Sequence, residues 1–222
     1  MYETAVVIGW WLAFAATHMV LSSQALRPKL IARLGTGPFM GVYSVIAFAT
    51  FIPLVAYYWG HRHRGALLWA PPSAEWVQGF AMVLMAIAFV LIAASLITPA
   101  PTLAGRSETG KARGVHLVTR HALFMGLALW AAIHLIYNGF ASDIAFFGGF
   151  VLFGIVGGWH QDKRRLASDD AGEYRAFCAD APFFPFTGKQ TVRGLKETSK
   201  IAVIVGLAAS VVIRSFHHHI VG

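Results

Sequence analysis

The sequence is poor in charged residues and nearly free of cysteine. Only 13% of its 222 residues are charged, and Cys178 is its single cysteine, whereas an average soluble domain carries about 25% charged residues. One thiol cannot form an intramolecular disulfide or a multi-cysteine zinc or iron–sulfur site. The composition therefore argues against an ordinary soluble enzyme and a disulfide-bonded domain, and we expect Cys178 to be a small packed loop residue.

Motifs of the common soluble classes are also missing. The sequence shows no strand alternation, P-loop, dinucleotide fingerprint, nucleic-acid motif or repeat of fixed period. What it has instead is a set of charge-free apolar runs, which cover residues 4–26, 34–61, 76–105, 121–142, 144–161 and 201–213. A helix needs roughly 20 apolar residues to cross a bilayer, because hydrocarbon offers no water to its backbone. We therefore predict an all-α polytopic membrane bundle of five to six transmembrane helices, with 201–213 as the doubtful span.

The basic residues predict how this bundle is oriented. The chain carries 18 Lys+Arg against 10 Asp+Glu, and 15 of the 18 lie in residues 23–38, 99–120 and 160–200. Basic loops of membrane proteins stay in the cytoplasm, so we expect a protein of the inner (plasma) membrane with its N-terminus outside. The net charge of +8 is then an orientation signal and not a sign of a nucleic-acid partner. Six spans would place the C-terminus outside, whereas five spans and a surface helix would keep it inside.

The longest polar insertion, 160–200, mixes charges with aromatic residues. We expect residues 161–178 to form a helix along the cytoplasmic membrane surface, and Pro182 and Pro185 to prevent an ordinary helix in the segment APFFPF. The insertion is either an interfacial helix with an aromatic anchor or a lid over a pocket, and both can hold. We divide the chain into a membrane domain, 1–188, and a C-terminal linker with the last apolar helix, 189–222.

Histidines near the ends of apolar runs are the candidate functional residues, because ionisable groups inside a span are costly. The four are His18, His121, His134 and His160. His18 lies about four residues, roughly 6 Å, from the cytoplasmic end of the first helix. If the fourth helix begins near Leu117, His121 lies at the same depth, and His134 lies about 20 Å further along. The sequence thus predicts that His18 and His121 are level with each other.

Two imidazoles at one depth on different helices suit the axial positions of a six-coordinate haem. The cations Arg120, Arg113 and Arg27 would lie on the same membrane face and could pair with the haem propionates. No intramembrane Asp or Glu is expected beside these histidines, which disfavours carboxylate acid/base catalysis and a dinuclear metal site. For a lone membrane histidine, a hydrogen bond to a neighbouring helix is the competing interpretation.

Several stretches, in this order along residues 5–188, resemble a known family. They are AATHMVLSS followed by RPKLIARLG, then YYWGHRHRGALLW, TRHALFMGLALWAAIH, and WHQDKRRL with EYRAF and PFFPF. The chain resembles the NnrU family of bacterial membrane proteins, a relative of the 15-cis-zeta-carotene isomerase of plants and cyanobacteria. The resemblance implies haem b binding through histidines at positions matching His18 and His121, with a third near His61.

The resemblance leaves the reaction open. Ala122 stands where the family has a proline after its Arg-His pair, which alters the start of the helix. The isomerase relative implies haem-dependent cis/trans isomerisation of an apolar, carotenoid-type molecule in the lipid bilayer. The NnrU branch implies a redox role linked to denitrification and nitrogen oxides.

Two other functions remain as alternatives. The Arg-His pair, Glu173, Tyr174 and the aromatic turn also look like the pattern of membrane thiol and isoprenylcysteine methyltransferases. In that interpretation His121 contacts S-adenosylmethionine, and Glu173, Tyr174 and APFFPF close the pocket. The third class is a non-enzymatic membrane accessory protein.

Overall fold

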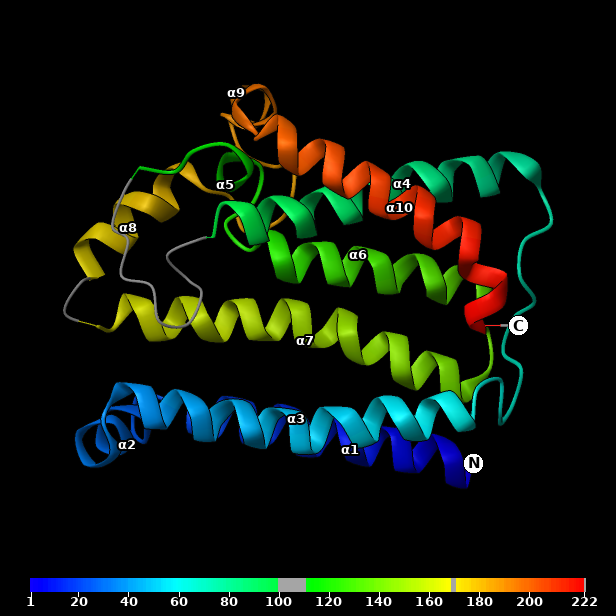
Figure 1. The fold of residues 1–222 in the computed structure, drawn as a ribbon, viewed down its shortest axis with the longest axis horizontal. Coiled ribbons are helices and arrows are strands. Elements are labelled where there is room, and N and C mark those ends of the chain that lie inside the picture. The colour runs from blue at the N-terminus through cyan, green and yellow to red at the C-terminus, as the bar shows by residue number, and fades with distance from the viewer. Residues whose placement is uncertain (100–110, 169–170, 222) are drawn as a thin grey trace. The chain divides into compact units, whose positions relative to one another are not determined.

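The computed structural model describes residues 1–99, 111–168 and 171–221, and helices make up its regular structure in these ranges (Figure 1). The long helices are α1 (Tyr2–Leu21), α3 (Thr36–Gly60), α4 (Glu75–Ile97), α7 (Ala141–Leu166) and α10 (Lys200–Val221). The shorter helices are α2 (Arg27–Leu34), α5 (Val115–Val118), α6 (Ala122–Tyr137), α8 (Ala171–Asp180) and α9 (Thr191–Glu197). The predicted all-α membrane bundle is confirmed.

The candidate membrane spans differ in one respect from the prediction. The helices α1, α3, α4 and α7 and the Lys200–His217 part of α10 are each long and apolar enough to cross a membrane. The last helix was expected to be the doubtful span, because its charge-free run ends before Arg214. The helix instead continues past Arg214 and the exposed residues beside it, and it ends at Val221. The short apolar helix is instead α6, with 16 residues, about 24 Å at 1.5 Å per residue.

The packing divides the chain into two compact units. The first unit comprises Met1–Pro72 and His134–Phe153, and the second comprises Ser73–Ile133 and Gly154–Gly222. The division falls within α6 and α7, so each of these helices contributes to both units. The boundary predicted at residue 188 separates the membrane domain from the C-terminal linker by their sequence composition. It stays a prediction.

In the first unit, α1 and α3 pack against each other along their length. The Trp11 indole Nε1 donates a hydrogen bond to the Phe146 carbonyl at 3.1 Å, which ties α1 to the start of α7. Gly149 makes this approach feasible, because a Cβ at that position would overlap the Trp11 ring. Val7 and Leu54 are fully buried in this unit.

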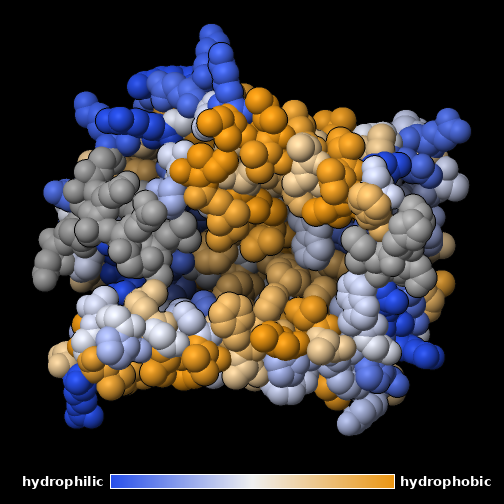
Figure 2. Space-filling view, viewed as in Figure 1, coloured by the Kyte–Doolittle hydropathy of each residue, from blue (hydrophilic) through white to orange (hydrophobic). Residues whose placement is uncertain are grey.

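In the second unit, α10 runs along α4 (Figure 1). The two backbones come so close that a Cβ on Gly206 would lie 2.6 Å from the Val90 Cα. A Cβ on Gly126 of α6 would similarly lie 2.9 Å from the Ala88 carbonyl oxygen of α4. The outer surface of α10 is a band of hydrophobic side chains (Figure 2), as expected for a helix that faces lipid.

The insertion between the last two long helices is built differently from the prediction. Residues 161–166 continue α7 rather than starting a surface helix, because the helical hydrogen bonding runs on to Leu166. The predicted surface helix is therefore wrong in its first part, and α8 is a separate helix, with residues 169–170 outside the described residues. As predicted from Pro182 and Pro185, the segment after α8 forms no ordinary helix.

Candidate functional site

A tight turn between α5 and α6 carries the Thr-Arg-His sequence. Thr119 is extended, and the His121 backbone N–H donates to the Thr119 hydroxyl oxygen at 3.3 Å. The His121 carbonyl accepts the first hydrogen bond of α6 from the Met125 N–H at 2.9 Å. His121 thus immediately precedes α6, and the expectation that the fourth helix begins near Leu117 is wrong, because the extended residue Thr119 separates α5 from α6.

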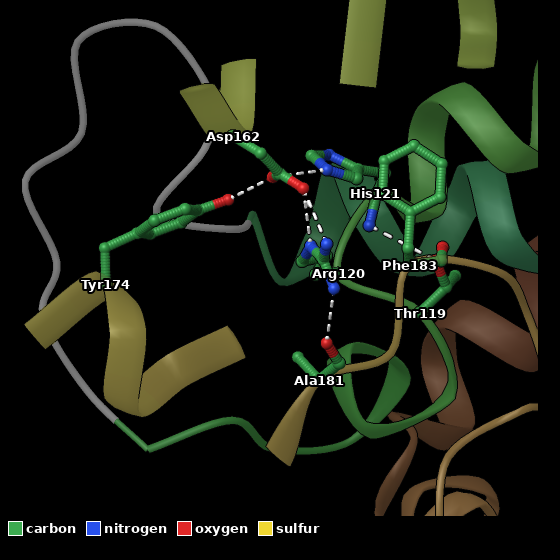
Figure 3. A network of polar contacts seen from close by, with 7 residues as sticks. All are labelled: Thr119, Arg120, His121, Asp162, Tyr174, Ala181 and Phe183. Atoms are coloured by element: carbon green, nitrogen blue, oxygen red, sulfur yellow. Dashed lines mark hydrogen bonds and ion pairs between the residues drawn. The ribbon is translucent and has the colours of Figure 1, made fainter. Parts of the chain in front are cut away.

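Asp162, near the end of α7, is the centre of the site (Figure 3). Its Oδ2 accepts two hydrogen bonds from the Arg120 guanidinium, at 2.9 Å from Nε and 2.6 Å from Nη2. Its Oδ1 lies 2.8 Å from the His121 Nε2 and accepts the Tyr174 hydroxyl at 2.6 Å. One carboxylate therefore joins the turn before α6, the end of α7 and helix α8.

The same contacts determine which nitrogen of His121 presents a lone pair. The Asp162 carboxylate accepts hydrogen bonds from the Arg120 guanidinium, and it is likewise the acceptor toward His121. In the neutral imidazole, Nε2 therefore carries the proton and Nδ1 carries the lone pair. Nδ1 is buried, and no residue in the described parts of the chain hydrogen-bonds to it. An unsatisfied buried nitrogen is unfavourable in a folded protein and is the kind of atom that binds a ligand.

The turn after α8 closes one side of His121. The Phe183 ring lies 5.1 Å from the His121 ring, centroid to centroid, in an edge-to-face arrangement, and the Arg120 guanidinium lies 5.1 Å from the centre of the Phe183 ring. Gly158 of α7 lies so close that a Cβ there would be 3.2 Å from the His121 Cδ2. His121 is consequently 3% exposed.

Hydrogen bonds to three backbone carbonyls hold the Phe183 turn in place. The Arg120 N–H donates to the Pro182 carbonyl at 2.9 Å, and its Nη1 donates to the Ala181 carbonyl at 3.0 Å. The Thr119 hydroxyl donates to the Phe183 carbonyl at 2.6 Å. The proposed lid segment is thus attached to the residues that position His121.

Burial shapes the chemistry of the neighbouring groups. Burial, and then the hydrogen bond and charge of Asp162, raise the pKa of Tyr174, so that this phenol stays a hydrogen-bond donor. Burial also raises the pKa of the Cys178 thiol, which agrees with a packed and unreactive cysteine. The expected loop position is wrong, because Cys178 lies in helix α8. Burial lowers the pKa of His116, whose Nε2 lies 2.8 Å from the Thr98 carbonyl.

The sequence-based expectation that no carboxylate accompanies the histidines is wrong for His121. Asp162 ends the charge-free run of α7, and the fold brings it against a histidine 41 residues earlier in the sequence. The expected propionate partner Arg120 lies against Asp162, and its pairing with a propionate stays a prediction. Arg113 is exposed just before α5, and its predicted role is likewise untested.

The other predicted ligands lie in the first unit. His18 is half-buried in the last turn of α1, among the rings of Phe14, Tyr43 and Phe153 at centroid distances of 4.9, 4.7 and 5.6 Å. His61 follows α3, stacks on Tyr57 at 4.1 Å and places its Nδ1 2.8 Å from the Tyr57 carbonyl. Because His18 and His121 belong to different units, their pairing at one cofactor stays a prediction.

A second histidine–aspartate pair, which the sequence did not reveal, lies in the first turn of α7. The fully buried Asp143 accepts the Tyr58 hydroxyl at 3.0 Å and the His63 backbone N–H at 3.1 Å, and the His63 Nδ1 lies 2.8 Å from its other oxygen. His63 has a left-handed backbone, with φ 54°, which is uncommon for a residue with a side chain. This pair fastens the segment after α3 to α7.

Comparisons with known proteins place the chain in a family without defining its chemistry. Within residues 1–99, 111–168 and 171–221, no three His, Cys, Asp or Glu side chains gather in a way that could hold a metal ion. No curated protein and no solved structure matches the chain. A family model described as NnrU protein matches residues 6–222. Because the match extends over nearly the whole sequence, the chain belongs to the NnrU family.

Proposed function

We propose that this protein binds haem b in the membrane, with the Nδ1 of His121 as an iron ligand. The observation that carries the proposal is the buried Nδ1, to which no described residue hydrogen-bonds, on a ring whose Nε2 is held by Asp162. Histidines that bind metals characteristically donate their other ring N–H to a carboxylate or a backbone carbonyl. The donor chemistry at His121 therefore fits a haem ligand.

The surrounding residues support this role. Asp162 fixes the orientation of the ring, and Arg120, which donates two hydrogen bonds to Oδ2, balances the carboxylate charge. Phe183 and Gly158 cover part of the ring and exclude water from it. Haem iron, when bound, supplies a redox-active centre that also coordinates small or apolar molecules.

For the reaction, we propose cis/trans isomerisation of an apolar polyene. Such a substrate partitions into the bilayer, and the apolar rings of Phe183 and Phe124 lie beside the candidate ligand, with centroids 5.1 and 6.1 Å from that of His121. The isomerisation rotates one double bond and leaves the substrate with the same atoms and electrons. A nitrogen-oxide-linked redox role would use the same ligand. The reaction assay separates the two, because only isomerisation converts a cis-polyene, such as 15-cis-zeta-carotene, without consuming an oxidant or a reductant in stoichiometric amounts.

Absorption spectra test the cofactor directly. The full chain is purified in mild detergent from haem-replete cells, and spectra are recorded before and after reduction with dithionite. We expect Soret and α bands that His121→Ala abolishes or shifts and that His134→Ala leaves unchanged. His18→Ala tests the predicted second ligand in the same way. Absence of the bands in the unaltered protein, or equal effects of all three substitutions, would refute the assignment of His121.

The methyltransferase alternative has less support from the site. The Tyr174 hydroxyl, expected to help close a cofactor pocket, is engaged by Asp162 at 2.6 Å, and Glu173 is exposed. Calorimetry with S-adenosylmethionine distinguishes this alternative, because haem binding through His121 predicts no heat of binding for that compound.

A further inference from the structure

Helix α9 is a short, exposed helix that joins the Phe183 turn to the apolar helix α10. Its sequence, TVRGLKE, places basic and apolar residues next to each other. Both apolar side chains face outward, with Val192 66% and Leu195 54% exposed. Contact with water alone does not favour the exposure of both aliphatic side chains of a two-turn helix.

Gly194 defines which face of α9 points outward. This glycine is buried against α5, where a Cβ would lie 2.7 Å from the Leu117 Cβ and 2.8 Å from the Gly114 carbonyl oxygen. Residues two positions before and after Gly194 point to the opposite side of a helix with 3.6 residues per turn. Val192 and Lys196 therefore form the outer face, with Leu195 at its edge.

The basic residues on this surface differ in whether an acidic residue neutralises them. Arg193 is neutralised by Glu197, whose Oε1 lies 2.6 Å from the Arg193 Nε. Lys196 and Lys200 are exposed, and no hydrogen bond or ion pair in the described residues engages either ammonium group. Two free positive charges thus lie beside the exposed Val192 and Leu195.

The start of α10 places this surface beside the bilayer. Lys200 is the first residue of a candidate membrane span, and Ile201 and Ile204 directly after it are 66% and 65% exposed. The hydrophobic band of α10 and hydrophilic side chains in the region of α9 are both visible in Figure 2. Only two residues separate α9 from α10, so the outer face of α9 lies next to the first residues of this candidate span.

We propose that Val192, Leu195, Lys196 and Lys200 form a binding surface for anionic phospholipids. The two ammonium groups pair with the headgroup phosphate, and the two aliphatic side chains enter the boundary between headgroups and acyl chains. The surface is separate from the His121 site and does not depend on haem.

Lipid titration of the purified full-length protein tests the proposal. Phosphatidylglycerol or phosphatidylcholine is added in detergent, and retained lipid is measured by native mass spectrometry, with the melting temperature as a second readout. We expect preferential retention of phosphatidylglycerol. The double substitution Lys196→Gln and Lys200→Gln should weaken it about 30-fold, because each basic residue near anionic lipid contributes about 1 kcal/mol and 1.4 kcal/mol is tenfold.

Matched controls decide between specific and general charge effects. Arg175→Gln removes an exposed cation from α8 in the same unit and should leave phosphatidylglycerol binding unchanged. Equal retention of both lipids would overturn the proposal, and so would an equal loss of phosphatidylglycerol binding in Arg175→Gln. A rise in melting temperature with inorganic phosphate as large as that with phosphatidylglycerol would also overturn it. So would a lipid-independent dimer that the double substitution dissociates, because a second copy of the chain would then occupy this surface.

Discussion

Two buried aspartates on α7 each accept hydrogen bonds from a tyrosine hydroxyl and interact with a histidine. Asp143 lies in the first turn with Tyr58 and His63, whereas Asp162 lies near the end and adds Arg120 to Tyr174 and His121. A buried carboxylate is unfavourable unless several donors satisfy it. The two pairs differ in their histidines, because His63 is exposed and His121 is buried. Of the two, only His121 has a buried ring nitrogen to which no described residue hydrogen-bonds.

Replacement of Asp162 by asparagine should destabilise the protein markedly. Asp162→Asn removes the charge that balances Arg120 and turns an amide group toward it, and breaking a buried pair in this way costs about 3 kcal/mol. The free energy of unfolding in detergent measures the effect. Asp180→Asn is the matched control, because Asp180 is half-buried and accepts one side-chain hydrogen bond, from Gln190. Equal losses in the two variants would argue against a central role for Asp162.

His116 should make stability depend on pH on the acid side. Burial lowers its pKa in the folded state, so the unfolded chain, with a pKa of about 6.5, binds the proton more readily. The stabilisation is complete above that value and is lost as the pH falls below it, by up to about 1.4 kcal/mol per pH unit. His116→Gln should flatten this loss when unfolding is compared between about pH 7.5 and about pH 5.5. Parallel pH profiles of the two proteins would contradict the assignment.

The sequence was informative for single residues only where a local pattern marks them. His121 could be selected because it lies near the end of an apolar run. Asp162 was visible in WHQDKRRL, but its role depends on a contact across 41 residues, which no local periodicity encodes. His63 and Asp143 were missed for the same reason.

Helix ends follow from the sequence less well than helix existence. The charge-free runs predicted the long helices, because charges are excluded from a bilayer-length apolar segment. They could not predict that α5 and α6 are separate, since Thr119 is extended in a sequence with no glycine or proline to mark a break. They also missed α9, whose position depends on the approach of Gly194 to α5.

Gly206 should be essential for the contact between α10 and α4. Its added Cβ would meet backbone atoms, 2.6 Å from the Val90 Cα and 2.9 Å from the Phe89 carbonyl carbon, which cannot move aside as a flexible side chain can. Gly206→Ala should therefore lower the free energy of unfolding by about 2 kcal/mol. Gly79→Ala on α4 provides the control, because nothing lies within 4 Å of a Cβ there, and alanine favours the helix by about 0.5–1 kcal/mol. A neutral Gly206→Ala would mean that α10 is not packed closely on α4.

Whether the whole molecule has an odd or an even number of membrane-spanning helices depends on whether α6 crosses the membrane. Its 16 residues cover about 24 Å, less than the roughly 30 Å of hydrocarbon. Several basic residues lie between α7 and α10, among them Arg175, Lys189 and Lys196, whereas the segment after α3 carries only Arg62 and Arg64. Only a crossing by α6 places these two groups on opposite membrane faces, which is the distribution that membrane insertion favours.

We therefore predict that six helices cross the membrane and that both termini lie outside the cytoplasm. A reporter that is active only outside, fused after Gly222, should be active, and a reporter inserted at the exposed Lys189 should be inactive. The Arg62–Arg64 segment gives the complementary control, because a cysteine introduced there, in a Cys178→Ala background, should react with a membrane-impermeant thiol reagent in intact cells. If the C-terminal reporter is inactive while the Arg62–Arg64 cysteine reacts, then α10 does not cross. If the Lys189 reporter is active, then α6 does not cross, and the orientation deduced from the basic residues fails with it.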